Sequence, residues 1–118
     1  MSELKVVFHV NNPAQWETAL GNITNLLKDV GDGGVRVVVL TNGPSVKAYA
    51  DEGLLQRMKA LADRGVSFRA CRNSLNNLCA GGEVCLNEGS LPDFIEVVPA
   101  GITELIRLQM EGFAYVKP

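Results

Sequence analysis

Apolar residues recur along this chain in two alternating patterns. Five short runs rich in β-branched residues have the composition of buried strands. They cover residues 4–10, 35–40, 66–70, 94–98 and 113–116. Between these runs, apolar residues return every three or four positions, as they do on one face of a helix. Strand and helix therefore alternate, which predicts a parallel sheet covered by helices on both faces.

Turn-forming residues mark the ends of the predicted helices. Asn12 is placed to cap the first helix, Pro13 suits its first turn, and Gln15 stands where a capping box needs Glu or Gln. Helical spacing then covers residues 16–30, 54–62, 75–79 and 102–106, with a weaker, shorter helix at 46–50. The segment from 80 to 93 carries no regular pattern and is expected to be a loop.

Composition fits one domain with a substantial core. The chain has 118 residues, of which 47% are hydrophobic and 20% charged. A net charge of −2 without a basic patch argues against a nucleic-acid partner. No apolar run is long enough to span a membrane, and the first residues lack the features of a signal peptide. We therefore predict a cytoplasmic protein that binds neither membrane nor nucleic acid.

Cys71 occupies the most informative position in the chain. An apolar run ends just before it and a helical pattern begins just after it, so its thiol is expected at a strand's carboxyl end and a helix's amino end. Unpaired N–H groups and the helix dipole favour a thiolate there and can lower its pKa. The flanking Arg69 and Arg72 could also favour an anion. The alternative is that Cys71 is only a small buried residue.

Polar residues follow the predicted strands at the same edge of the sheet. The candidates for a binding cleft are His9, Asn11, Asn42, Gly43, Arg72, Asn73 and Ser74. The backbone N–H groups of the last three could hold an anion. Each asparagine also suits a helix cap or a turn, and His9, the only histidine, also suits a structural role or a base near the thiol.

The other two cysteines are expected to serve different purposes. Three cysteines do not suggest a disulfide framework, so free, redox-active or metal-binding thiols are expected. Cys79 lies on an apolar helical face and is expected to fill the core. Cys85 lies in the predicted loop and is either a resolving thiol for Cys71 or incidental. The spacing is not that of a zinc site, and no phosphate-binding loop follows a strand, so neither a metal nor a cofactor is predicted.

Several segments together resemble the DsrE/DsrF-like family of small intracellular sulfur-handling proteins. They are residues 5–11, 16–27, 68–75, 99–105 and 109–115. The resemblance implies a single α/β domain over residues 1–118, a three-layer α/β/α sandwich with a five-stranded parallel sheet ordered 4-3-2-1-5. It also implies homo-oligomers, often trimers or hexamers, and a persulfide-carrying role for Cys71. That order would put Asn42 and Gly43 beside Cys71, with His9 two strands away, about 10 Å.

These observations support one leading hypothesis and one alternative. In the first, Cys71 accepts sulfane sulfur as a persulfide and passes it on, as a sulfurtransferase or a sulfur carrier with donor and acceptor proteins. Such a cysteine needs a low pKa and an exposed position. In the alternative, the chain is a non-catalytic module for small-ligand binding or assembly, and Cys71 is a bystander. Tyr49, Leu86 and Leu91, in segments of weak pattern, are candidates for an oligomer contact.

Overall fold

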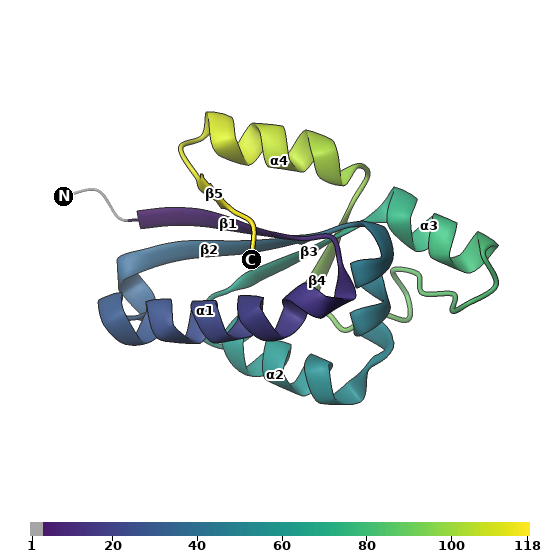
Figure 1. Ribbon diagram of the computed structural model, residues 1–118, viewed down its shortest axis with the longest axis horizontal. Coiled ribbons are helices and arrows are strands. Elements are labelled where there is room, and N and C mark those ends of the chain that lie inside the picture. The colour runs from purple at the N-terminus through teal and green to yellow at the C-terminus, as the bar shows by residue number, and fades with distance from the viewer. Residues whose placement is uncertain (1–3) are drawn as a thin grey trace.

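The computed structural model describes residues 4–118 and has a five-stranded, all-parallel sheet at its centre (Figure 1). In chain order the strands are β1 (Leu4–Val10), β2 (Val35–Thr41), β3 (Ser67–Cys71), β4 (Ile95–Val98) and β5 (Ala114–Val116). Their order in the sheet is β4-β3-β2-β1-β5, which confirms the implied arrangement. The first three residues of the predicted domain lie outside the described part of the chain.

Four α-helices and three short 3-10 helices connect these strands. The α-helices are α1 (Trp16–Val30), α2 (Glu52–Ala62), α3 (Arg72–Ala80) and α4 (Gly101–Met110). The 3-10 helices are η1 (Pro13–Gln15), η2 (Asp32–Gly34) and η3 (Gly43–Ala50). The short helix expected at 46–50 therefore exists, but it begins earlier and is a 3-10 helix. The predicted loop before β4 is confirmed.

The capping box predicted before α1 forms as expected. The Asn12 side chain accepts a hydrogen bond from the Ala14 N–H (3.0 Å), and the Gln15 side chain accepts one from the Asn12 N–H (3.2 Å). These bonds satisfy N–H groups that a helix start leaves unpaired. They also fix the turn by which the chain leaves β1 and brings Trp16 into the core, where it is 1% exposed.

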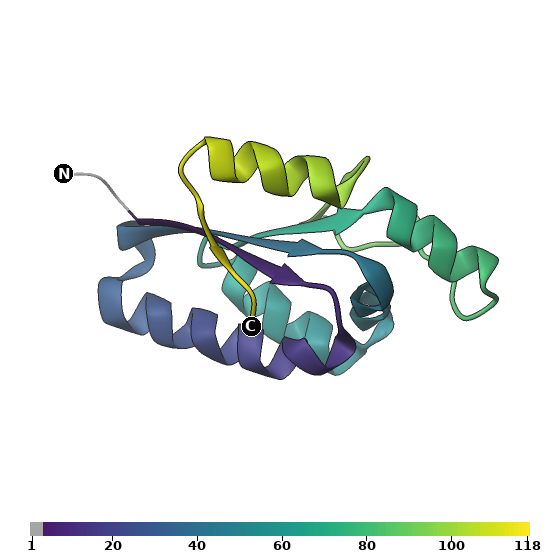
Figure 2. The same cartoon turned by 45° about the horizontal axis from the view of Figure 1, so that its top comes forward.

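Helices cover both faces of the sheet, which confirms the three-layer arrangement (Figures 1 and 2). The larger core joins one face to α1, α2 and η3, and it includes Phe68, Ile23 and Met58. The smaller core joins the other face to α4, chiefly through Leu105 and Leu108. Both sides of the central strands β1 and β2 are thus buried along most of their length, as their continuous apolar runs require.

The chain path reverses direction across the sheet after β4, so the helices that follow β3 and β4 leave in opposite directions. The first four strands step across the sheet in one direction, and the chain then crosses back to β5. As a result, α3 packs its apolar side into the larger core while α4 packs into the smaller one. Neighbouring strands thus send their helices to opposite faces, which is where open α/β sheets bind ligands. In both views α3 extends beyond the strand ends (Figures 1 and 2).

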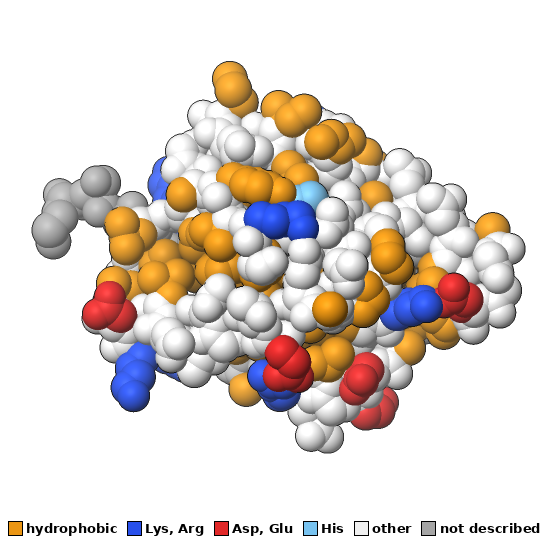
Figure 3. Space-filling view, in the orientation of Figure 1, with side chains coloured by type: hydrophobic (Ala, Val, Ile, Leu, Met, Phe, Trp, Pro, Cys, Tyr) orange, Lys and Arg blue, Asp and Glu red, His pale blue; other side chains and the backbone are white. Residues whose placement is uncertain are grey.

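The residues expected to contact another copy of the chain pack inside the fold instead. Tyr49 and Leu91 are buried, and Leu86 packs against the same core. Tyr49 is held there because its hydroxyl shares a hydrogen bond with Thr41 (2.6 Å). The large apolar side chains that are exposed include Ile102, Ile106 and Met110 on the outer side of α4, and orange atoms line that edge of the molecule (Figure 3).

No helix within residues 4–118 is long and apolar enough to cross a membrane.

Candidate functional site

The strand register places the candidate residues in one row on the α4 face of the sheet. His9 pairs with Leu40, and Leu40 pairs with Arg69. Paired residues point to the same face, and so do residues two apart on one strand. Cys71 follows Arg69 by two positions, and Tyr115 of β5 pairs with Val7, two positions before His9. The row therefore runs from Tyr115 through His9 to Cys71.

Cys71 ends β3 and caps the start of α3, as the sequence predicted. Its thiol is free, and the residue is only 5% exposed. Cover comes from the first turn of α4 on the smaller-core side. An apolar neighbourhood of this kind would normally oppose a thiolate, so its hydrogen bonds decide the outcome.

Hydrogen bonds favour the thiolate form of Cys71. Burial raises the pKa of the thiol. Hydrogen bonds from the Ser74 hydroxyl and from the backbone N–H groups of Gly101, Ser74 and Asn73 lower this pKa by a larger amount. The net result is a Cys71 pKa below its ordinary value. The amino ends of two helices meet at this sulfur, because Ser74 and Asn73 belong to the first turn of α3 and Gly101 begins α4.

The Ser74 hydroxyl is oriented by Gly43. The Gly43 N–H donates to Ser74 Oγ (2.8 Å), which leaves the hydroxyl hydrogen available to Cys71. Gly43 adopts φ +62°, and a Cβ at this position would lie 3.2 Å from the Asn11 carbonyl oxygen. A glycine is therefore required at the turn after β2 so that its N–H can reach Ser74.

Gly101 lets α4 approach the thiol closely. A Cβ added to Gly101 would lie 3.1 Å from Leu40 Cδ1, 3.3 Å from Cys71 Cβ and 3.4 Å from Asn42 Cβ. A side chain at this position would force the neighbouring side chains or the helix start to shift by a few tenths of an ångström. These distances also show that Asn42 and Cys71 flank the same point.

A hydrogen-bonded chain links β5 to Asn42. His9 Nε2 lies 2.8 Å from Asn42 Oδ1, and His9 Nδ1 lies 2.6 Å from the Tyr115 hydroxyl. Since Oδ1 only accepts, Nε2 carries the hydrogen, and in the neutral ring Nδ1 accepts from Tyr115. Within residues 4–118 the Asn42 amide nitrogen has no partner, so its two hydrogens are free on the side away from His9.

The remaining polar candidates have other partners or none. Asn11 accepts a hydrogen bond from the Lys117 ammonium (2.9 Å), and the Asn73 side chain is exposed. Arg69 pairs with Glu104 of α4 (2.7 Å), and Arg72 pairs with Glu88.

Neither arginine is among the groups that shift the Cys71 pKa. The anion-favouring charge expected from Arg69 and Arg72 is therefore neutralised by carboxylates. The effect on the thiol comes from uncharged donors.

Cys79 and Cys85 form a disulfide, which corrects the expectation of three free cysteines. Both residues are exposed. Cys79 does not fill the core, because α3 packs through Leu75 and Leu78 while its last turn projects past the sheet. Cys85, bonded to Cys79, does not serve Cys71 as a resolving thiol here. Cys79 lies eight positions after Cys71, which is a rise of about 12 Å along the helix.

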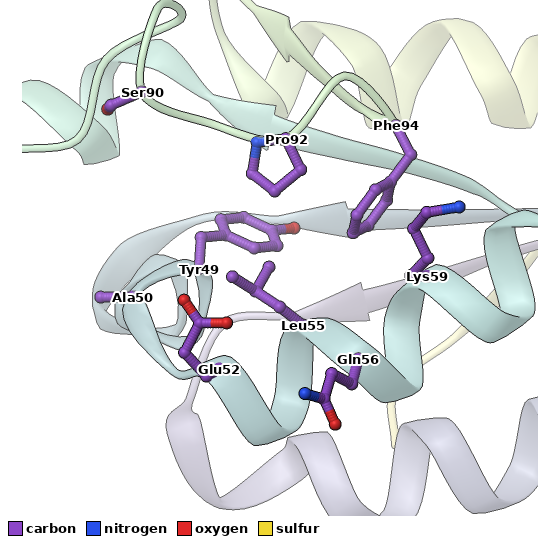
Figure 4. A pocket seen from close by; sticks show the side chains of 9 residues that line it. All are labelled: Tyr49, Ala50, Glu52, Leu55, Gln56, Lys59, Ser90, Pro92 and Phe94. Carbon is purple, nitrogen blue, oxygen red and sulfur yellow. The ribbon is translucent and has the colours of Figure 1, made fainter.

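The larger hollows of the surface lie away from Cys71. One cleft of about 460 Å³ lies between η3, α2 and the segment before β4, where Tyr49, Leu55, Pro92 and Phe94 face one another (Figure 4). No predicted site residue lines it. A smaller hollow of about 280 Å³ borders Gly43 and Ser74. Within residues 4–118, no group of three His, Cys, Asp or Glu side chains is placed to hold a metal ion.

Comparison with known proteins places the chain in a family. The family model described as "DsrE/DsrF-like family" matches residues 32–118. The chain belongs to the DsrE/DsrF-like family. The matched part contains β2 to β5 and hence Asn42, Cys71, Gly101 and Tyr115, whereas His9 lies before it.

Two solved structures extend the likeness to nearly the whole chain. A protein of unknown function, MTH1491 from Methanobacterium thermoautotrophicum, is 28% identical with a TM-score of 0.83 over 98% of this chain and 100% of that one. The ychN protein from E. coli is 13% identical with a TM-score of 0.71 over 100% of both chains, which shows the shared fold. No curated protein matches the chain.

Replacing Gly101 with alanine should both destabilise the protein and weaken the thiolate. The new methyl group would crowd Leu40, Cys71 and Asn42, and the shift that relieves this crowding is expected to lengthen the contact between the Gly101 N–H and Cys71. We expect a loss of about 1–3 kcal/mol in the free energy of unfolding. Gly21→Ala is the control, because its added Cβ meets no atom within 4 Å and should stabilise α1 by about 0.5–1 kcal/mol. Equal effects in urea titrations would contradict the proposed crowding.

The pH dependence of Cys71 alkylation should respond to the Ser74 hydroxyl. A lowered pKa means more thiolate at a given pH, so the midpoint of the rate profile should lie below that of an ordinary cysteine. Ser74→Ala should raise the midpoint and slow alkylation at neutral pH about 10-fold. Asn73→Ala keeps its backbone N–H and should leave the midpoint in place. A midpoint that shifts equally in both variants would mean that the hydroxyl is not the donor.

Proposed function

We propose that this chain is a sulfane-sulfur carrier whose acceptor is the Cys71 thiolate. The observation that supports it most is the set of hydrogen bonds that lower the Cys71 pKa despite burial. Family membership supports sulfur relay in general terms. Structural cysteines in apolar surroundings usually lack such donors, and their thiols stay neutral.

The transfer needs only a thiolate and a donor with a sulfur–sulfur bond. The Cys71 sulfur attacks the outer sulfur of a persulfide or polysulfide, and its electron pair forms a new S–S bond. The donor's S–S bond breaks, and its electron pair leaves on the donor thiolate, which takes a proton from water. An acceptor thiolate later attacks the outer sulfur and releases the Cys71 thiolate. Neither step involves a net oxidant or reductant.

The burial of Cys71 limits which donors can reach it. The sequence hypothesis expected an exposed thiol, but only 5% of the residue is exposed, because α4 begins directly beside it. A bulky disulfide cannot present its sulfur there without moving α4. We therefore propose small, linear donors such as polysulfide, or a persulfide on a flexible segment of a donor protein.

Asn42 is proposed to hold the outer sulfur. Its amide nitrogen has no partner within residues 4–118, and its Cβ and that of Cys71 flank the same point beside Gly101. Its carbonyl oxygen is fixed by His9, which is fixed in turn by Tyr115. His9 and Tyr115 are therefore proposed as positioning residues, and His9 is not needed as a base for a thiol that ionises on its own. Asn11, Arg72 and the Asn73 side chain are proposed as the outer rim of the site.

The low exposure of Cys71 also favours a second candidate function. A cysteine that is 5% exposed can be a bystander in a small-ligand-binding module whose polar groups include Asn42 and Ser74. The two functions differ in one property, which is whether Cys71 itself gains sulfur.

Family membership also suggests oligomerisation. The trimer or hexamer stays a prediction, and light scattering would test it.

Exposure to a polysulfide should add one sulfur atom, about 32 Da, to the peptide that contains Cys71. The Cys79→Ser/Cys85→Ser double variant, in which Cys71 is the remaining cysteine, should still gain it. Cys71→Ser should lose it while keeping its fold, since serine suits the start of a helix.

Mass spectrometry of the folded proteins measures each outcome. Sulfur added to Cys71→Ser but not to the double variant would contradict the carrier function. That result would favour the binding module.

Tyr115→Phe should slow sulfur loading without changing the ionisation of Cys71. The variant removes the hydroxyl that holds His9, so Asn42 is free to rotate. Loading should slow about 3- to 10-fold, the value of one hydrogen bond. The midpoint of Cys71 alkylation against pH should not move, because no donor to the thiol comes from Tyr115.

The chain offers a matched control in its second tyrosine. Tyr49→Phe deletes a hydroxyl that bonds Thr41 on the other face of the sheet. It should cost stability but leave the loading rate unchanged. A shift of the Cys71 midpoint in Tyr115→Phe would contradict a purely positioning role.

A further inference from the structure

A second sulfur site lies at the far end of α3. Cys79 belongs to the last turn of this helix, and Cys85 follows in the segment that leads to β4. Their disulfide joins residues six positions apart, and both side chains are exposed. The carrier function proposed for Cys71 makes no use of this bond.

We propose that the Cys79–Cys85 disulfide is a redox-active site that exchanges with small thiols such as glutathione and controls the charge beside Cys71. A thiolate attacks one sulfur of the bond, and the other cysteine leaves as a thiolate and takes a proton from water. A second thiol attacks the mixed disulfide and releases the first cysteine. Two small thiols are thereby oxidised to one disulfide, and Cys79 and Cys85 are reduced to two thiols.

The position of the disulfide favours a role in thiol–disulfide exchange over a role in stabilising the fold. Small thiols can reach it, since both residues are exposed. It closes a short ring, which constrains the unfolded chain less than a long ring would. The surrounding fold does not depend on it, because α3 is anchored by Leu75 and Leu78 and the segment before β4 by Leu91. In the cytoplasm that the sequence predicts, disulfides are usually transient or redox-sensing.

Glu88 connects this bond to Cys71. It lies three residues after Cys85 and pairs with Arg72, the residue directly after Cys71. With the disulfide closed, the segment is tied to α3 and Glu88 neutralises the Arg72 guanidinium. Once the bond is reduced, Leu86 and Leu91 still hold the segment against the core, but Cys85 no longer ties it to α3. The Glu88–Arg72 pair is exposed and therefore weak without that tie. Arg72 then spends part of its time unpaired, and its positive charge attracts anions to Cys71.

This link predicts a charge-selective change in Cys71 reactivity. Iodoacetate is an anion and iodoacetamide is neutral, so the ratio of their rates at Cys71 reports the local charge. Reduction should raise the ratio about 1.5- to 5-fold, the range expected for an exposed ion pair, and added salt should remove the gain. Glu88→Gln should show the raised ratio even with the disulfide closed. The Cys79→Ser/Cys85→Ser variant should show it without a reductant.

The exchange itself is tested separately, in Cys71→Ser protein with excess reduced glutathione. Mass spectrometry should show the pair gaining two hydrogen atoms while circular dichroism stays that of the folded protein. A bond that persists until urea unfolds the chain would be structural, and the proposal would be wrong. A rate ratio that reduction leaves unchanged in the wild-type chain would overturn the link to Cys71. Neither experiment measures sulfur loading, so both results are independent of the carrier function.

Discussion

The site depends on the contact between the start of α4 and the end of β3. Gly101 has no Cβ, so its N–H reaches the Cys71 thiol, and α3 begins at the same sulfur. The thiolate is thus stabilised by neutral donors at two helix starts, while the nearby arginines pair with carboxylates. A fixed counter-cation would bind a thiolate tightly and slow its exchange. Dispersed N–H and O–H donors serve a thiolate and a persulfide anion alike.

Chain topology explains why these groups meet. Had the chain added a fifth strand beyond β4, α4 would have covered the same face as α3. Crossing back to β5 places α4 on the opposite face, so the two helices leave neighbouring strands in opposite directions. The same crossing pairs β5 with β1 and brings Tyr115 to His9. One topological step therefore builds both the thiolate pocket and the hydrogen-bonded chain beside it.

The sequence predicts the elements and the place of Cys71 well, because periodicity and helix-start signals are local. It also brings out His9 and Asn42, since polar residues at strand ends share one edge of a parallel sheet. Gly101 and Tyr115 were missed as site residues. The signal for Tyr115 was its alternation within the last strand, which became informative only once β5 was paired with β1. No sequence signal marks Gly101, because its role depends on a contact between helix and sheet. The Cys79–Cys85 bond was missed because an apolar helical position does not show that the helix projects past its sheet.

The length of α3 separates the two proposed kinds of sulfur chemistry, which would interfere if they met. The sulfane transfer proposed for Cys71 is redox-neutral, whereas the exchange proposed for Cys79 and Cys85 moves two electrons. A reduced pair in contact with a Cys71 persulfide would take its outer sulfur and close to a disulfide, releasing hydrogen sulfide and wasting the cargo. Cys79 lies eight positions along α3 from Cys71, about 12 Å away, which prevents that contact within one folded chain. The Glu88–Arg72 ion pair connects the surroundings of the two sites through charge. Under the two proposals, the redox state adjusts how readily Cys71 attracts an anionic donor without consuming the sulfur that Cys71 would carry.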